Sequence, residues 1–236
     1  MEKYKGKINI YSLIEGAKKA EGLVVIIDVF RAFSLECYLY SYGAGLVRPV
    51  GKIDEAFNWK IKNPGCILVG EREGRMCEGF DFGNSPSSVD PKSVKDKIVI
   101  HTTSAGTQGV VNAVLADEII TGSLVNARAI AKYILMKNPD EVSLVCMGNG
   151  GIRPAKEDEL CAEYIKSILI GEEMSDINSL AKGLQYDGGE HFFREELKDV
   201  FPNEDFWLCT KVNCFDFVLR INKDENGFYS EKIMME

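Results

Sequence analysis

The chain has 236 residues, 45% of them hydrophobic, and its 36 acidic and 28 basic side chains give a formal charge of −8 at pH 7. This length and apolar content suffice for one sizeable core, and the negative charge argues against nucleic acid or an anionic membrane surface as the partner. The first residues lack a signal-peptide hydrophobic segment, and no run reaches the roughly 18 apolar residues of a membrane helix, so a cytoplasmic protein is expected.

Short runs rich in β-branched residues have the length and composition of strands. They cover residues 7–11, 23–27, 47–50, 66–69, 98–100, 118–121 and 142–146. Helix-like stretches lie between several of them, at 32–42, 54–63, 107–115 and 126–137. Strands that alternate with helices usually pair in parallel, because parallel neighbours need a crossover connection. Residues 1–154 therefore predict an α/β fold with a mostly parallel sheet, mixed at its edge, and helices on both faces.

The last third of the chain, residues 155–236, has a different pattern. Long helical patterns cover 155–171 and 175–184, and shorter helix-like pieces lie at 191–200 and 205–212. Two further runs, 215–221 and 228–233, flank a polar turn and predict a terminal hairpin on the sheet edge. Since no linker or repeat separates the two parts, we interpret residues 1–236 as a single α/β domain with a helix-rich C-terminal third.

Polar residues follow five of the predicted strands, where an open parallel sheet binds its ligands. In chain order these residues are Asp28, Arg31, Glu71, Arg72, Arg75, Thr102, Thr103, Ser104, Gly106, Asn126 and Arg153. Each one alone is also typical of a helix N-cap or a tight turn. Five such strand ends on one edge of the sheet favour an anion site with a metal.

The turn Thr102-Thr-Ser-Ala-Gly-Thr107 is the clearest candidate for a phosphate cradle. Hydroxyls and successive backbone N–H groups at the start of a helix can surround phosphate oxygens. No Gly-Lys-Ser/Thr follows, so the turn does not indicate nucleotide triphosphate binding. The alternative interpretation is a helix capped by Thr and Ser.

Acidic residues open the helix predicted over 155–171. Its apolar face is defined by Leu160, Cys161, Tyr164, Ile165, Ile168 and Leu169. On the helical wheel, Glu157 lies within about 30° and Asp158 within about 70° of the centre of this face, whereas Glu159 points to the opposite side. Inward acids need a cation such as Mg²⁺ or an arginine. Alternatively, they project from the first turn into solvent and favour the helix dipole.

Six segments, in order along the chain, resemble the 2-phosphosulfolactate phosphatase family. They are DVFRA (28–32), GER (70–72), EGFDFGNSP (78–86), TTSAGT (102–107), GSLVN (122–126) and EDELCA (157–162). The long segment 79–86 is the most specific of them, and the last 70 residues match no motif. The resemblance implies that family's α/β fold and a Mg²⁺-dependent hydrolase that releases phosphate from 2-phospho-3-sulfolactate. The reaction gives 3-sulfolactate and, as the resemblance implies, is a step in the biosynthesis of coenzyme M.

Such a substrate combines a phosphate, a carboxylate and a sulfonate, so we expect arginines and a dication around it. The candidate catalytic residues and Mg²⁺ ligands are Asp28, Glu71 and Asp158, followed by Glu157 and Asp81. Arg31 and Arg72 would bind the phosphate or the carboxylate, and Arg75 or Arg153 would bind the sulfonate. The hydroxyls of Thr102, Thr103 and Ser104 would donate to phosphate oxygens. Gly106 and Asn126 complete the substrate-binding set. Attack by water and attack by Asp28, giving an aspartyl-phosphate, both stay open.

Two other classes of function fit the same pattern. One is an isochorismatase-like hydrolase, because a strand that ends at Asp28 suits that class and Cys146 closes a later strand as a candidate nucleophile. The other is a non-catalytic module that binds an anion without turnover. The expected partner in the main interpretation is a small phosphorylated hydroxyacid, with no nucleic acid and no membrane. Aromatic residues on the outer helices would allow a homodimer.

Overall fold

The computed structural model describes residues 3–236. Met1 and Glu2, the first two residues of the N-terminal stretch in which no signal peptide is predicted, lie outside the described part. The strands are β1 (Lys7–Ser12), β2 (Gly22–Ile27), β3 (Leu46–Pro49), β4 (Ile67–Arg72), β5 (Arg75–Met76), β6 (Ile98–Thr102), β7 (Ala116–Gly122), β8 (Glu141–Cys146), β9 (Phe217–Asp224) and β10 (Gly227–Met234). The α-helices are α1 (Leu13–Ala17), α2 (Ala32–Ser41), α3 (Ile53–Lys62), α4 (Pro91–Val94), α5 (Gly106–Asn112), α6 (Ala127–Lys137), α7 (Lys156–Leu169), α8 (Ile177–Gly183) and α9 (Asn203–Cys209).

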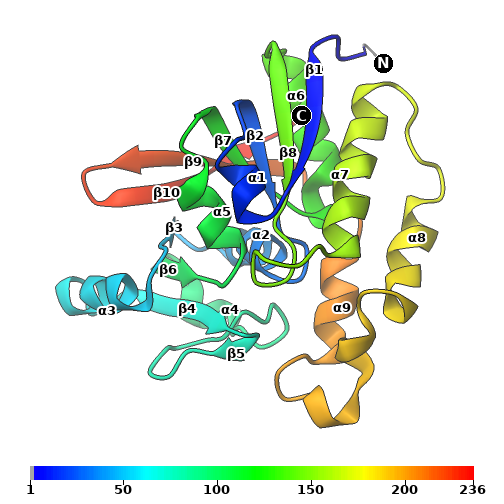
Figure 1. Ribbon diagram of the computed structural model, residues 1–236. Helices are drawn as coiled ribbons and strands as arrows, with labels where there is room; N and C mark the ends of the chain where they lie inside the picture. The colour runs from blue at the N-terminus through cyan, green and yellow to red at the C-terminus, as the bar shows by residue number, and fades with distance from the viewer. Residues whose placement is uncertain (1–2) are drawn as a thin grey trace.

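These strands form one ten-stranded mixed sheet in the order β1-β8-β2-β7-β9-β10-β3-β6-β4-β5 (Figure 1). The predicted α/β class is therefore confirmed, and the predicted strands lie close to the observed ones. The patterns did not indicate α1, α4 or β5, which are short. The helix-like piece at 191–200 consists of two 3-10 turns, Glu190–Phe193 and Glu195–Leu197. Among the helices of residues 3–236, none has both the length and the apolar character needed to cross a membrane.

The sheet consists of two parallel blocks joined by the C-terminal hairpin. Strands β1, β8, β2 and β7 form one block and β3, β6 and β4 the other. The hairpin β9–β10 lies between them, antiparallel to β7 on one side and to β3 on the other. The prediction of a hairpin on the sheet edge is therefore wrong. The hairpin pairs with strands that would otherwise be exposed edges of the two blocks, which removes two unpaired rows of N–H and C=O groups.

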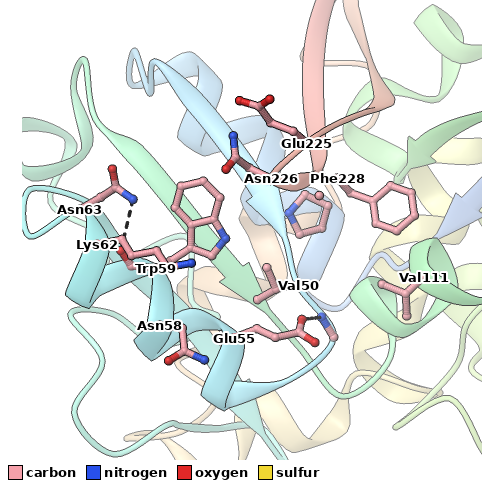
Figure 2. Close-up of a pocket in the computed structure, with 13 residues that line it drawn as sticks. Val50, Glu55, Asn58, Trp59, Lys62, Asn63, Val111, Glu225, Asn226 and Phe228 are labelled. Carbon is pink, nitrogen blue, oxygen red and sulfur yellow. Dashed lines mark hydrogen bonds between the residues drawn. The ribbon is translucent and has the colours of Figure 1, made fainter.

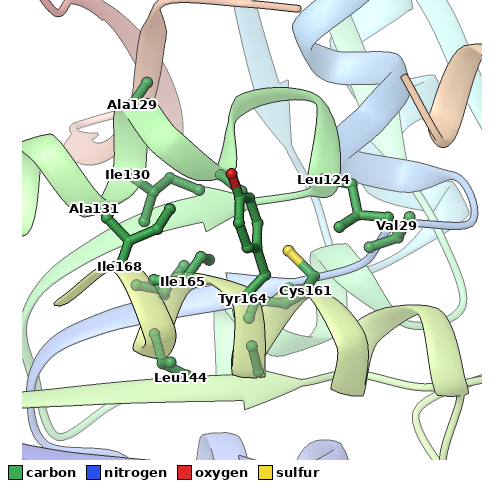
Figure 3. Close-up of a cluster of buried hydrophobic side chains, with 14 of the residues drawn as sticks. Val29, Leu124, Ala129, Ile130, Ala131, Leu144, Cys161, Tyr164, Ile165 and Ile168 are labelled. Atoms are coloured by element: carbon green, nitrogen blue, oxygen red, sulfur yellow. The ribbon is translucent and has the colours of Figure 1, made fainter. Parts of the chain in front are cut away.

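Both faces of β2 are buried, which explains its unbroken apolar sequence. Its residues Leu23, Val25 and Ile27 face a core cluster built with α6 and α7, whereas the alternate residues Val24 and Ile26 face a cluster built with α1 and α5. Figure 3 shows the first cluster, in which the apolar side chains of α7 pack toward α6 and the sheet. This packing fixes the direction in which the first turn of α7 points.

Candidate active site

Asp28 directly follows β2 and is buried, with 5% of its surface exposed. Its Oδ1 accepts a hydrogen bond from the Ala32 backbone N–H at 3.1 Å. The start of α5 lies against the same carboxylate, because a Cβ added to Gly106 would lie 2.9 Å from Asp28 Oδ2 and from the Ala32 Cβ. Gly106 thus permits a close approach of helix and carboxylate that a side chain would obstruct.

The first turn of α7 brings two more acids to this place. Glu157 and Asp158 are buried and Glu159 is exposed, so the orientations predicted from the helical wheel are confirmed. Asp158 Oδ1 accepts the Val29 N–H at 2.8 Å, and its Oδ2 accepts the Gly148 N–H at 2.7 Å. The Asp158 carboxylate therefore joins the loop after β2 to the loop after β8.

Asp28, Glu157 and Asp158, here called the carboxylate cluster, raise one another's pKa values. Burial raises the pKa of Asp28 well above its usual range, and the charge of Asp158 adds to the effect. Burial, followed by the charge of Asp28, raises the pKa of Glu157 to about 8. Burial and the charge of Glu157 likewise raise the pKa of Asp158. Three acids whose charged forms are all disfavoured require protons or a cation at neutral pH.

Glu71, at the end of β4, occupies the turn that the sequence predicted as a phosphate cradle. Its Oε1 accepts the Ser104 N–H at 2.6 Å, and its Oε2 accepts the Ser104 hydroxyl at 3.1 Å and the Gly74 N–H at 2.7 Å. The Thr103 hydroxyl accepts the Thr107 N–H at 3.2 Å, as in the alternative interpretation of a capped helix. The turn does hold an anion, but that anion is a carboxylate of the chain itself.

Arg31 was expected to hold substrate, and the structure pairs it with Asp205 instead. Its Nη1 lies 2.8 Å from Asp205 Oδ2 and donates to the Val200 carbonyl at 2.8 Å, while Nη2 donates to the Gly74 carbonyl at 3.1 Å. The side chains of Arg31 and Asp205 are 3% and 0% exposed. The charge of Arg31 is thus compensated by an acid of the chain itself, which argues against the predicted role as an anion clamp. Asp205 was missed because it lies in the last 70 residues, where no motif was recognised.

The remaining arginines keep their charge available. Arg72 donates to the Thr102 hydroxyl at 3.0 Å and to the Gly51 carbonyl at 3.3 Å, both neutral acceptors. Arg75 and Arg153 are exposed. Within residues 3–236, none of these three arginines forms an ion pair with an acid. They stay candidates for the anionic groups of a substrate.

Two predicted site residues have other partners in the fold. Asp81 accepts the Leu68 N–H at 2.8 Å and pairs with Lys60 at 3.0 Å, beside the first half of β4 rather than at its carboxyl end. The Asn126 side chain is fully buried, accepts the Ser123 N–H and donates to a backbone carbonyl of β9. These contacts argue against a ligand role for Asp81 and a substrate role for Asn126.

A divalent cation suits the chemistry of the carboxylate cluster, although the ligands are not preassembled. Within the described residues, no group of three Asp, Glu, His or Cys side chains is arranged to hold a metal ion. Both Asp158 oxygens and Asp28 Oδ1 accept backbone N–H groups, and each carboxylate oxygen has a second lone pair that can bind a cation. Mg²⁺ is often held by one or two carboxylates together with water and substrate phosphate, so this donor set fits it.

Cys146 does not have the surroundings of a nucleophile. It is 2% exposed and belongs to the core cluster around α7. Burial, with the charge of Asp158, raises the pKa of its thiol, which disfavours the reactive thiolate. These surroundings argue against the isochorismatase-like alternative.

A cavity of about 500 Å³ lies away from the carboxylate cluster, between α3 and the turn of the β9–β10 hairpin (Figure 2). Trp59 and Phe228 contribute apolar walls, and Glu55, whose carboxylate accepts the Gly51 N–H, lies at its rim. Lys62 is its one basic lining residue. Because it contains none of the clustered acids or arginines, we do not assign the phosphorylated ligand to it.

The fold and the site define an α/β protein whose candidate active site is built from buried carboxylates, which lie at strand ends and in the first turn of a helix. Residues 8–224 match the family described as 2-phosphosulpholactate phosphatase, and the chain belongs to this family. A probable 2-phosphosulfolactate phosphatase of Carboxydothermus hydrogenoformans is 37% identical over 223 residues, covering 90% of this chain and 92% of the relative. Proteins with the same name from Caldanaerobacter subterraneus (34%; 89% and 92% covered) and Bacillus subtilis (30%; 85% and 87% covered) are also similar. The family is one of phosphoric monoester hydrolases.

Proposed function

We propose that this protein hydrolyses 2-phospho-3-sulfolactate, or a closely related 2-hydroxyacid phosphate, in a Mg²⁺-dependent reaction. The observation that carries the proposal is the carboxylate cluster at the end of β2 and the start of α7, three buried acids that form no ion pair with a basic side chain of residues 3–236. Membership of the phosphatase family supports the reaction class.

The arginines without acidic partners would bind the anionic groups of the substrate. Arg72 ends β4, and Arg75 lies opposite it across the β4–β5 pair. Arg153 lies on the loop after β8, and that loop borders the turn of Ser104, since a Cβ on Gly151 would lie 3.8 Å from the Ser104 carbonyl oxygen. Phosphate, carboxylate and sulfonate would thus meet positive side chains from two loops.

The cluster would supply the charge that the reaction needs. Asp28 and Glu157 would hold Mg²⁺, which supplies neutralisation of the charge that develops on phosphate. Asp158, fixed by two backbone N–H groups, would keep the loops after β2 and β8 in position around Asp28. Position 30, two residues after Asp28, is Phe, so the acid/base carboxylate of haloacid-dehalogenase phosphatases is absent at that spacing. This favours water as the nucleophile over an aspartyl-phosphate.

A phosphate-release assay tests this function. Phosphosulfolactate, phospholactate and phosphoglycolate are each incubated with the protein, with Mg²⁺ and with EDTA. We expect release from phosphosulfolactate that EDTA abolishes and Mg²⁺ restores. Thermal stabilisation by these compounds without release from any of them would instead favour the non-catalytic anion-binding alternative. Release of 3-sulfolactate would support the place in coenzyme M biosynthesis that the resemblance implies.

A further inference from the structure

The Arg31–Asp205 pair connects segments that lie far apart in the sequence. Arg31 belongs to the loop that begins with Asp28, and Asp205 lies in α9, 174 residues later. In Figure 1, α9 lies beside the end of α7 that carries the carboxylate cluster. Both partners are almost completely buried, so solvent screens the pair little. A buried pair of this kind is expected to fix the relative positions of the elements that carry it.

From Arg31 the contacts continue to the predicted substrate-binding turn. Its Nη2 donates to the Gly74 carbonyl at 3.1 Å, the Gly74 N–H donates to Glu71 at 2.7 Å, and Glu71 accepts the Ser104 N–H at 2.6 Å. Asp205, Arg31, Gly74, Glu71 and Ser104 therefore form one continuous polar chain. It runs from α9 through the β4–β5 turn to the turn after β6.

The other oxygen of Asp205 holds the most specific of the six family-like segments. Asp205 Oδ1 accepts the Ser85 hydroxyl and the Ser87 N–H, both at 2.9 Å. One carboxylate thus binds the end of segment 79–86 and, through Arg31, the β4–β5 turn. This arrangement gives a role to the last 70 residues of the chain, which contain none of the six segments.

The β4–β5 turn also packs against the side chain of Phe201. Gly74 has φ +80°, and a Cβ there would lie 2.4 Å from Phe201 Cζ, so the turn packs directly on this ring. Arg31 Cζ lies 4.8 Å from the centre of the same ring, within cation–π range. Val200, the residue before Phe201, accepts from Arg31 through its carbonyl. Segment 200–205 therefore clamps the β4–β5 turn.

We infer that Asp205 is a positioning residue for substrate binding, which acts through Arg31 and the β4–β5 turn to keep Arg72 and Arg75, on either side of that turn, in their binding arrangement. Arg31 belongs to the same device and does not touch the substrate. The inference rests on the proposed function, because the turn it positions is the one to which we assign the substrate anions.

The variant Asp205→Asn tests the inference, since it keeps the shape of the side chain and removes its charge. We expect KM for the phosphorylated substrate to rise about tenfold or more, with kcat changed much less, because the binding groups are displaced while the carboxylate cluster is untouched. The matched control is Asp224→Asn, which breaks the Arg48–Asp224 pair elsewhere in the fold and should leave KM unchanged. Unchanged KM in Asp205→Asn, or an equal rise in the control, would overturn the inference.

Gly74→Ala perturbs the same turn from its other end and keeps the test decisive if Asp205→Asn folds poorly. It should raise KM in the same way, because its Cβ would collide with Phe201. The double variant Asp205→Asn/Gly74→Ala should raise KM no more than the larger single change, since one contact path is already broken. Multiplication of the two effects would show independent sites and contradict the inference.

Hydrogen exchange separates failure of this inference from failure of the proposed function. Asp205→Asn should increase deuterium uptake at residues 71–76 and leave the uptake of α7 unchanged. This measurement needs no substrate, so it tests the clamp even if the wild-type protein releases no phosphate from any compound of the panel. Wild-type uptake at 71–76 in a folded Asp205→Asn variant would overturn the clamp itself.

Discussion

Asp28 and Arg31 are three residues apart in the same loop, yet the fold gives them opposite surroundings. Arg31 has a buried counterion, Asp205, and backbone carbonyls around its guanidinium. Asp28 has two further acids as neighbours and no basic partner among the ion pairs of residues 3–236. A compensated charge holds segments together, whereas uncompensated charges cost stability and persist at sites that bind cations or substrates. The comparison supports the inferred positioning role of Arg31 and the proposed catalytic role of Asp28.

The largest expected difference between the two residues is in catalysis. Asp28→Asn should lower kcat/KM for phosphate release by about 100-fold or more, because it removes a charge at the centre of the cluster. The same change should leave the free energy of unfolding equal or higher, since it relieves repulsion. Kinetics and urea denaturation of the variant check both expectations, and wild-type turnover would remove Asp28 from the mechanism.

Arg31→Met should produce the opposite result on stability. We expect the free energy of unfolding to fall by about 3–5 kcal/mol, because Asp205 is left buried without its partner. The double variant Arg31→Met/Asp205→Asn should recover a large part of this loss, since no unpaired charge remains. Chemical denaturation measures all three proteins. A single variant as stable as the wild type would mean that the pair is not the architectural element described above.

The pH dependence of stability sharpens the contrast. Burial and the charge of Asp28 raise the pKa of Glu157 to about 8 from an ordinary value near 4.5, so between these pH values the folded state binds more protons than the unfolded state. Metal-free protein should therefore lose stability as the pH rises from about 4.5 through 8. Glu36, whose buried carboxyl has a pKa of about 7, contributes with the same sign. Glu157→Gln should flatten the pH profile of the melting temperature, and Mg²⁺ should stabilise the wild type most at high pH. A profile unchanged by Glu157→Gln would contradict the assignment.

A smaller effect is expected where a helix meets the cluster. Gly106→Ala should lower the free energy of unfolding by about 1–3 kcal/mol, because the new Cβ would lie 2.9 Å from Asp28 Oδ2 and from the Ala32 Cβ. It should also reduce phosphate release by displacing the Asp28 carboxylate. Gly183→Ala is the matched control, since nothing lies within 4 Å of its added Cβ. Equal stability of the two variants would show that the close approach at Gly106 is unimportant.

The smallest expected effect concerns the thiols. Brief alkylation of the native protein at neutral pH should leave phosphate release unchanged, because Cys146 is buried and burial, with the charge of Asp158, raises its thiol pKa. Cys214, which is only half-buried, is the expected site of modification and serves as the internal control in mass spectrometry. Rapid loss of activity with modification at Cys146 would revive the isochorismatase-like alternative.

The patterns that could be read from the sequence are local. The apolar run of β2 and the inward orientation of Glu157 and Asp158 depend on residues two to four positions away, so strand and helix periodicity predicted them correctly. The position of the terminal hairpin was predicted incorrectly. The local sequence pattern of its two strands would be the same at the edge of the sheet and between the two parallel blocks, so the pattern cannot distinguish these positions. Which strands were left without a neighbour depends on the whole sheet.

The sequence by itself therefore determined the α/β class, the strand ends at which polar residues gather, and the acids that face inward from α7. Only the tertiary structure decided the partners of these residues: Asp205 for Arg31, Ser104 and Gly74 for Glu71, and, in the part of the chain that the structure describes, no ion-pair partner for Asp28. The physical reason is that the strength of an ion pair depends on distance and burial in space, and a pairing of two residues that are 174 positions apart in the sequence produces no local pattern.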